Sequence, residues 1–270
     1  MDTALRRPAV AGRFYPADAS SLRAEVETYL GAPYQEARSA VALLAPHAGY
    51  VFSGTTAGAA YARVQVPTRV VVLCPNHTGL GAQRSIWPSG SWQLPGEAVD
   101  IESKLASRIR DEARLTADTQ AHWQEHAIEV QLPFLLARQA NLHFVPICLA
   151  HLSFAECREV GEGLARAIAA TPSPVLIVVS TDMSHYISAD SARRLDHLAL
   201  DRVLALDAEG LYATVKQQGI SMCGYIPTTV ALLAAVALGA RRAELTHYAH
   251  SGQVSGDYDH VVGYASVVID

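Results

Sequence analysis

Three histidines stand directly after apolar, strand-like segments of this chain, where they could bind a metal ion or move protons. The pairs of segment and histidine are 40–46 with His47, 70–76 with His77, and 175–182 with His185. In α/β proteins, ligands and reacting groups gather just beyond the carboxyl ends of the strands. Histidine is a common metal ligand, and it gains or loses a proton near neutral pH. The pattern therefore predicts a metal site or an acid–base site at one edge of a sheet.

Polar neighbours of these histidines extend the candidate site. Asp182 could orient an imidazole or bind a metal, and His185 could bind the same metal or act as a general acid and base. Asn76 precedes His77, and Tyr50 ends the segment Pro-His-Ala-Gly-Tyr that contains the first histidine. The alternative for each polar residue is a local role, in which it only satisfies the backbone groups of a turn.

A shared metal ion is the sharper interpretation of the first two histidines. Neighbouring strands lie roughly 5 Å apart, so His47 and His77 could reach one ion if their strands are neighbours. Two histidines and one anionic ligand are typical of non-haem iron sites. The anion could be Cys223, Asp182 or Glu129, and the spacing along the sequence does not choose among them. A thiolate ligand would favour copper(I) or zinc, although iron remains compatible.

Two further segments could contribute to the site. Residues 124–139 are predicted to form a helix, which Pro133 should kink or restart. His126 and Glu129 are three residues apart, so a helix would place them on one face. Cys223 shortly precedes another predicted helix, and a helix N-terminus favours the thiolate form of cysteine. The alternatives are a solvated helix face for the first segment and a small buried thiol for the second.

Strand-like and helix-like segments alternate along the 270 residues. This alternation predicts an α/β fold with a central, mostly parallel or mixed sheet and helices on both faces. No repeat or linker divides the chain, so residues 1–270 are expected to form a single domain. Further strands are predicted at 142–149, 244–250 and 260–269, and a hairpin or loop at 78–99. Helices are predicted at 20–30 with Ser20 or Ser21 as N-cap, 54–63 after Ser53, 100–112, 154–170, 188–206 and 228–238.

Composition excludes several classes of protein. The net charge is −5 without any basic run, which argues against nucleic acid as a partner. No stretch approaches the roughly 20 apolar residues that span a bilayer, and no apolar signal core follows Arg6 and Arg7. We therefore expect a soluble, cytoplasmic protein that binds no membrane. Cys74 and Cys148 lie in apolar segments and are expected to be buried thiols, so disulfides are not expected.

Seven motifs together resemble those of the Memo-like family, in the same order and over essentially the full length. They are RPAVAGRFYP at 7–16, PHAGY at 46–50 with FSG at 52–54, PNH at 75–77, EHAIEV at 125–130 with LP at 132–133, STDMSHY at 180–186, CG at 223–224 and DHVVGY at 259–264. The resemblance implies the fold of class III extradiol dioxygenases, which hold iron with two histidines and a carboxylate. It also implies, for microbial members, a radical-SAM protein and a third protein as partners, and for animal members a signalling role.

The resemblance also assigns roles to residues of this chain. His47 and His77 match the two histidine ligands, and Cys223 matches the third ligand, where the dioxygenases place a glutamate. This difference argues against ring cleavage. His185 matches the acid–base histidine beside the metal, and Asp182 is expected to orient it.

The leading hypothesis is a cytosolic, metal-dependent redox protein or oxidoreductase with a dioxygenase-like pocket and a substrate that the sequence does not identify. Iron is the expected metal, with copper or zinc as alternatives. Tyr50, Asn76, His126 and Glu129 are expected to line the pocket or support the ligands. One rival is a non-catalytic module or scaffold that binds a peptide, a phosphorylated group or a protein partner through Tyr50 and the tryptophans. Another is a true extradiol dioxygenase.

Overall fold

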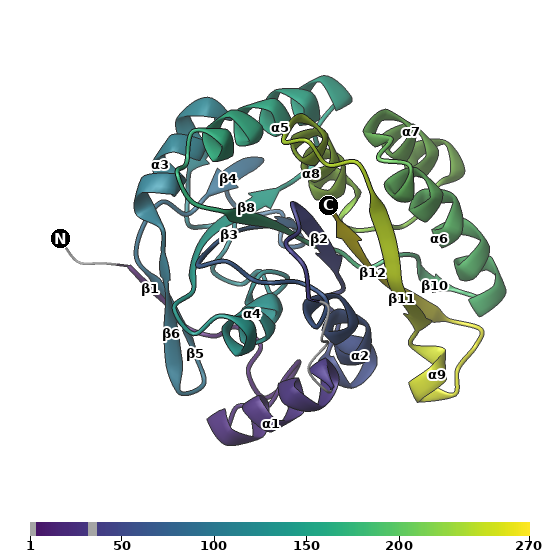
Figure 1. Ribbon diagram of the computed structural model, residues 1–270. Coiled ribbons are helices and arrows are strands. Elements are labelled where there is room, and N and C mark those ends of the chain that lie inside the picture. The colour runs from purple at the N-terminus through teal and green to yellow at the C-terminus, as the bar shows by residue number, and fades with distance from the viewer. Residues whose placement is uncertain (1–3, 32–36) are drawn as a thin grey trace.

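A mixed β-sheet with helices on both faces forms the centre of the protein (Figure 1). The computed structural model describes residues 4–31 and 37–270. Twelve strands take part in the sheet among these residues, and they confirm the predicted α/β fold. The strands are β1 (Leu5–Arg6), β2 (Ala42–Ala45), β3 (Arg69–Pro75), β4 (Arg84–Ile86), β5 (Ser91–Leu94), β6 (Glu97–Ile101), β7 (Thr116–Ala117), β8 (His143–Leu149), β9 (Val175–Ser180), β10 (His185–Ile187), β11 (Ala243–His250) and β12 (Val261–Ile269).

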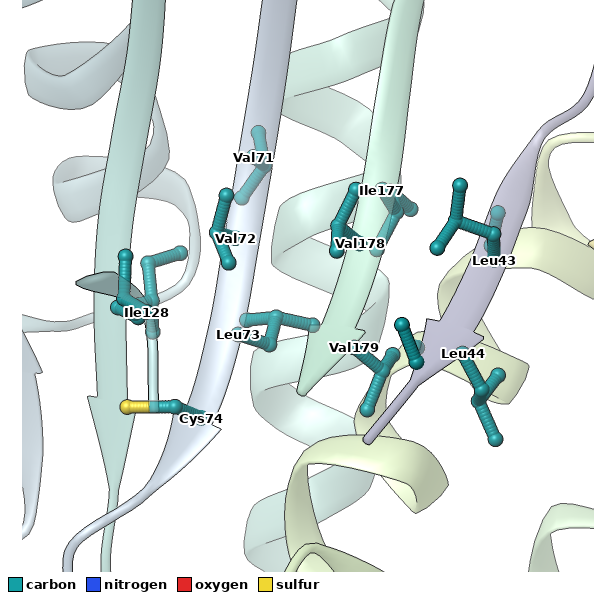
Figure 2. Packing of buried hydrophobic residues seen from close by; sticks show 14 of the residues in the cluster. Leu43, Leu44, Val71, Val72, Leu73, Cys74, Ile128, Ile177, Val178 and Val179 are labelled. Carbon is teal, nitrogen blue, oxygen red and sulfur yellow. The ribbon is translucent and has the colours of Figure 1, made fainter. Parts of the chain in front are cut away.

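The strands that precede His47 and His77, β2 and β3, are not neighbours in the sheet. The order along the main path is β1-β5-β6-β8-β3-β9-β2-β12-β10. β9 therefore lies between β3 and β2, and it pairs in parallel with both. Figure 2 shows Val178 and Val179 of β9 between Leu73 on one side and Leu43 on the other. The condition that the strands before His47 and His77 be neighbours is not met, because sequence order does not fix order within a sheet.

The central strands are buried on both faces, which explains their continuous apolar sequences. Val70–Cys74 of β3 and Leu176–Val179 of β9 have no exposed surface. Parallel strands between two helical layers have no solvent-facing side, so polar and apolar residues do not alternate in them. Cys74 and Cys148 face each other across β3 and β8, and both are buried as expected.

Helices cover the two faces of the sheet as separate groups. α3, α5 and α8 pack together on one face, while α1, α2 and α4 pack together on the other (Figure 1). α6 and α7 lie beside the β12 end of the sheet. The helices are α1 (Ala19–Leu30), α2 (Tyr50–Tyr61), α3 (Ser103–Glu112), α4 (Leu132–Arg138), α5 (Phe154–Ala169), α6 (Ala189–Leu204), α7 (Ala208–Gln218), α8 (Tyr225–Ala237) and α9 (Gly252–Ser255). No helix within the described ranges is both long and apolar enough to cross a bilayer.

Helix starts differ from the predicted ones where capping was misassigned. The α1 N-cap is Asp18, whose carboxylate accepts the Ser21 amide, rather than Ser20 or Ser21. α2 begins at Tyr50, so Ser53 lies inside the helix instead of capping it. Its hydroxyl donates to the carbonyl of Ala48, one turn earlier. Ser and Asp both serve as N-caps, and the sequence alone does not rank adjacent candidates.

The segment 124–139 is not one helix, and this changes how its polar residues are placed. Residues before Glu129 form turns, a 3-10 turn covers Glu129–Gln131, and α4 starts at Leu132 with Pro133 in its first turn. The predicted restart near Pro133 is thus confirmed, but His126 and Glu129 do not share a helix face. The Glu125 carboxylate binds the Ala127 amide, which offers the backbone an alternative to a helical bond.

Candidate metal centre

Two of the strand-end histidines meet over the end of the strand that separates them. His47 follows β2, His77 follows β3, and their ring centroids are 5.1 Å apart. Strands two positions apart in a sheet are separated by about 10 Å, so both loops must lean across the end of β9. The sheet edge therefore brings these side chains together although their strands are not neighbours.

His126 completes a triangle of imidazoles with these two residues. Its ring centroid lies 5.3 Å from that of His47 and 5.0 Å from that of His77. One ring nitrogen from each of the three histidines lies within 4.8 Å of the others. Three nitrogens at this spacing can move onto a single ion with nitrogen–metal distances of about 2 Å after small side-chain rotations. The three histidines are thus a group that could hold a metal ion.

Hydrogen bonds fix the tautomer of His47. Its Nδ1 lies 3.0 Å from the Ser180 hydroxyl, which donates its only proton to the Ala127 carbonyl. Gln131 donates to the same Ser180 oxygen at 2.8 Å. Because the hydroxyl proton is committed, Nδ1 of His47 must donate, and Nε2 of the neutral ring keeps a free lone pair. Burial, with a smaller effect of nearby His77, lowers the pKa of His47 to about 3, so the ring is neutral at physiological pH.

Glu125 holds the other two histidines. Its Oε1 lies 2.9 Å from Nδ1 of His77 and 3.4 Å from Nδ1 of His126, while its Oε2 accepts the His77 amide. Burial alone would raise the pKa of Glu125, but the hydrogen bond from His77 and the two imidazoles lower it to about 2. The ionised carboxylate therefore accepts the hydrogen bond from Nδ1 of His77 and directs Nε2 of that ring away from itself, while Nδ1 of His126 lies close to the same oxygen. The same bond and charge raise the pKa of His77 against the opposing effect of burial.

Cys223 reaches the same place from the loop before α8. Its Sγ lies 3.2 Å from Nε2 of His47 and accepts the Asp182 amide at 3.2 Å. Burial, reinforced by the charge of Asp182, raises the pKa of this thiol well above its usual value. The helix N-terminus alone therefore does not make Cys223 a thiolate, contrary to the expectation from the sequence. Without a cation, the S–H group can donate a hydrogen bond to the free lone pair of His47 Nε2. A bound cation would replace that proton.

His185 and Asp182 lie beside this cluster but do not bond to each other among the described hydrogen bonds. Nδ1 of His185 lies 2.9 Å from the Ser221 carbonyl, and its amide donates to the Ser221 hydroxyl. Ser221, rather than the expected Asp182, therefore orients His185. Asp182 instead accepts the His47 amide through Oδ1 at 2.8 Å. Burial raises the pKa of Asp182 against that hydrogen bond and the nearby imidazoles.

The remaining candidate residues have structural contacts outside the imidazole cluster. Asn76 accepts the Gly79 amide and so closes the turn after β3. Tyr50 is buried and donates to the Val130 carbonyl at 2.6 Å. Glu129 turns its carboxylate to the N-terminal segment, where the fully buried Arg6 lies 2.6 Å away.

Sequence reasoning missed the residues that hold the histidines in place. Glu125, Ser180, Gln131 and Ser221 stand within or beside the recognised motifs. Only Glu125 had a usable signal, because a buried carboxylate next to a candidate ligand histidine is a common orienting partner. The other three come from three separate segments, and no spacing along the chain predicts that they meet.

Comparison with known proteins agrees with this arrangement of motifs. A family model described as Memo-like protein matches residues 6–268. A MEMO1 family protein of Aquifex aeolicus (strain VF5) is 38% identical over 266 residues, which cover 98% of each chain. One of Methanopyrus kandleri is 40% identical over 97% of this chain and 98% of its own. Another, of Methanothermobacter thermautotrophicus, is 37% identical over 97% of this chain and 99% of its own.

Proposed function

The chain belongs to the Memo-like family, and from that premise we propose that it is a metal-dependent redox protein whose ion is bound by His47 and His77. Iron is the metal we propose first, because histidine nitrogens with one anionic ligand and open positions suit non-haem iron. Copper and zinc are the alternatives, and the thiol of Cys223 would favour copper(I) or zinc.

The orientation of the imidazoles carries this proposal. Nδ1 of three rings lies within hydrogen-bonding distance of an acceptor: Ser180 for His47, Glu125 for His77 and the Ser221 carbonyl for His185. For His47, whose burial keeps the ring neutral, Nε2 is therefore the unprotonated nitrogen. Metal-binding histidines almost always direct their second nitrogen to such an acceptor, which supports a metal-binding role for these rings.

The third ligand is proposed to be Cys223, with His126 as the competing candidate. Cys223 matches the family motif, and its Sγ is 3.2 Å from Nε2 of His47. His126 has the better triangular geometry with the two other imidazoles. The two candidates differ in charge, because a thiolate contributes a negative charge and an imidazole contributes none.

The other residues of the centre would handle protons and exclude water. A redox metal bound here would supply one-electron chemistry and open positions for a small molecule. His185 keeps its position through Ser221 and offers Nε2 as a proton acceptor beside Asp182. Asp182, almost fully buried, holds the His47 backbone in place through the amide. This arrangement suits proton transfer to a group bound at the centre.

A redox titration of the iron-loaded protein tests this function. We expect a reversible one-electron transition in the wild-type protein and none in the double variant His47→Ala/His77→Ala. Oxygen uptake with a panel of catechols, measured on the same samples, distinguishes ring cleavage from other redox roles. A wild-type protein that binds iron but shows no electron transfer over the accessible range of potential would contradict the redox proposal while leaving metal binding intact.

A further inference from the structure

A second site lies beside the candidate metal centre, in a cavity of about 760 Å³ between the N-terminal segment and residues 123–124. Arg7 and Arg13 line one side, and Trp123 and Gln124 line the other. We propose that this cavity binds a small molecule in which an anionic group, carboxylate or phosphate, is attached to a planar ring. This proposal goes beyond the metal-dependent function and does not depend on a bound metal.

The charge of the cavity points to an anion. Arg7 and Arg13 are both exposed, and neither forms an ion pair with a described residue. None of the described residues that line the cavity is acidic, although the chain as a whole has a net charge of −5. The contrast with a second arginine-lined cavity is sharp, because there Arg114 pairs with Glu159 and Arg166 with Glu112. Guanidinium groups bind carboxylates and phosphates through paired hydrogen bonds.

An exposed indole supplies the ring-binding surface. Trp123 is 42% exposed, which is unusual for so large an apolar side chain. Its ring packs against the buried Trp87, with centroids 4.8 Å apart, so one side of the indole is held by the core. A planar ligand that covers the open side would bury apolar area without requiring the tryptophan to become ordered.

The wall that carries the arginines is firmly anchored. The amides of Ala9 and Val10 both donate to the Glu129 carboxylate, and Arg6 beneath them bonds to Glu129 as well. Arg6 is fully buried, and its guanidinium lies 4.1 Å from the Trp92 ring centroid. Binding to a rigid wall costs little ordering entropy, so even a small ligand could bind measurably.

The cavity is joined to the metal centre at both walls. Arg13 precedes Phe14, whose ring centroid is 4.8 Å from that of His126. Gln124 directly precedes Glu125, the carboxylate that holds His77. A ligand bound between these walls would therefore lie next to the backbone segments that carry the imidazole cluster.

Titration calorimetry on the full-length, metal-stripped protein tests the site. The probes are benzoate and phenyl phosphate, with benzyl alcohol as the neutral ring and inorganic phosphate as the anion without a ring. We expect saturable binding of benzoate or phenyl phosphate with a Kd of about 1 mM or tighter, and clearly weaker binding of the other two. Whichever anionic probe binds more tightly identifies carboxylate or phosphate as the preferred group.

Matched charge variants decide whether the arginines are responsible. The double variant Arg7→Gln/Arg13→Gln should weaken binding about tenfold or more, and Trp123→Leu several-fold. The control Arg114→Gln/Arg158→Gln changes the net charge equally in the other cavity and should leave binding unchanged. The proposal is overturned if neither anionic probe binds saturably, if benzyl alcohol binds as tightly, or if the control weakens binding as much as the test variant.

Discussion

Nδ1 of His77 lies 2.9 Å from Oε1 of Glu125, and the same carboxylate oxygen lies 3.4 Å from Nδ1 of His126. One buried acid thus hydrogen-bonds the imidazole of His77 and lies close to that of His126. With His47 held by Ser180, one ring nitrogen from each of the three histidines lies within 4.8 Å of the others. A carboxylate behind a metal-binding histidine raises the basicity of the ligand and fixes its ring.

Replacing Glu125 by Gln should weaken metal binding about 10- to 100-fold, because outer partners of ligand histidines typically contribute that much. The amide keeps the size of the side chain, but its single oxygen cannot replace both carboxylate oxygens, which accept Nδ1 of His77 and two backbone amides. Competition with a chelator measures the affinity. Glu159→Gln, on a surface carboxylate paired with Arg84, serves as the control. Unchanged affinity in Glu125→Gln would show that the carboxylate does not support a metal site.

Metal affinity should rise with pH if Cys223 is a ligand. Burial raises the pKa of this thiol, so the metal must displace a proton that is still bound at neutral pH. Affinity should therefore increase up to about tenfold per pH unit between pH 6 and 8. Cys223→Ala should reduce that dependence to the part that comes from His77, whose raised pKa also makes proton loss part of metal binding, whereas His126→Ala should keep the full dependence. The same pH dependence in the wild-type protein and in Cys223→Ala would favour His126 as the third ligand.

The sequence predicted the edge of the sheet that carries the site but not how its members meet. The apolar segments before His47 and His77 have the signature of buried parallel strands, and both are such strands. Their separation by β9 depends on tertiary pairing between segments more than a hundred residues apart. No local pattern records that pairing, so the sequence could state adjacency of the two strands only as a condition, and the histidines meet across β9 instead.

The helix predicted at 124–139 shows a second limit of prediction from sequence, because only its C-terminal part is helical. Residues 124–128 have helical periodicity, but Glu125 binds its partners at Ala127 and His77, and Glu129 binds Arg6, 123 residues earlier in the chain. Long-range polar contacts of this kind override local propensity. Glu125 and Glu129 do not bond to helical neighbours, and their long-range contacts identify 124–131 as the segment that supports the candidate site.

The buried ion pair of Arg6 and Glu129 should contribute strongly to the free energy of unfolding. Both side chains are fully buried, and the carboxylate also accepts the Tyr15 hydroxyl at 2.7 Å. Glu129→Ala should lower the free energy of unfolding by about 3–5 kcal/mol, because it leaves a buried guanidinium without its partner. Glu112→Ala, which breaks an exposed pair with Arg166, should cost at most about 1 kcal/mol. Denaturant titration compares the two variants. Equal losses of unfolding free energy would contradict the claim that the buried pair of Arg6 and Glu129 stabilises the fold more than the exposed pair of Glu112 and Arg166.

Acid should destabilise the metal-free protein in part through His122. Burial, with the charge of Arg6, lowers the pKa of His122 to about 3, whereas the unfolded residue titrates near 6.5. The unfolded chain therefore binds the extra proton first, and stability falls as the pH falls from about 6.5 toward 3, by about 1.4 kcal/mol per pH unit for one histidine. His122→Gln should reduce the slope of unfolding free energy against pH by that amount. The exposed His143→Gln is the control, and an unchanged slope in His122→Gln would contradict the argument.

Metal analysis of protein purified without air tests the central claim most directly. Air is excluded because iron(II) and a cysteine ligand are both readily oxidised. The wild-type protein and His143→Ala/His151→Ala, which removes two exposed histidines, should each carry about one ion per chain. The variant His47→Ala/His77→Ala should carry almost none while retaining the wild-type circular dichroism. Full occupancy in that variant would contradict the assignment of His47 and His77 as the residues that hold the metal.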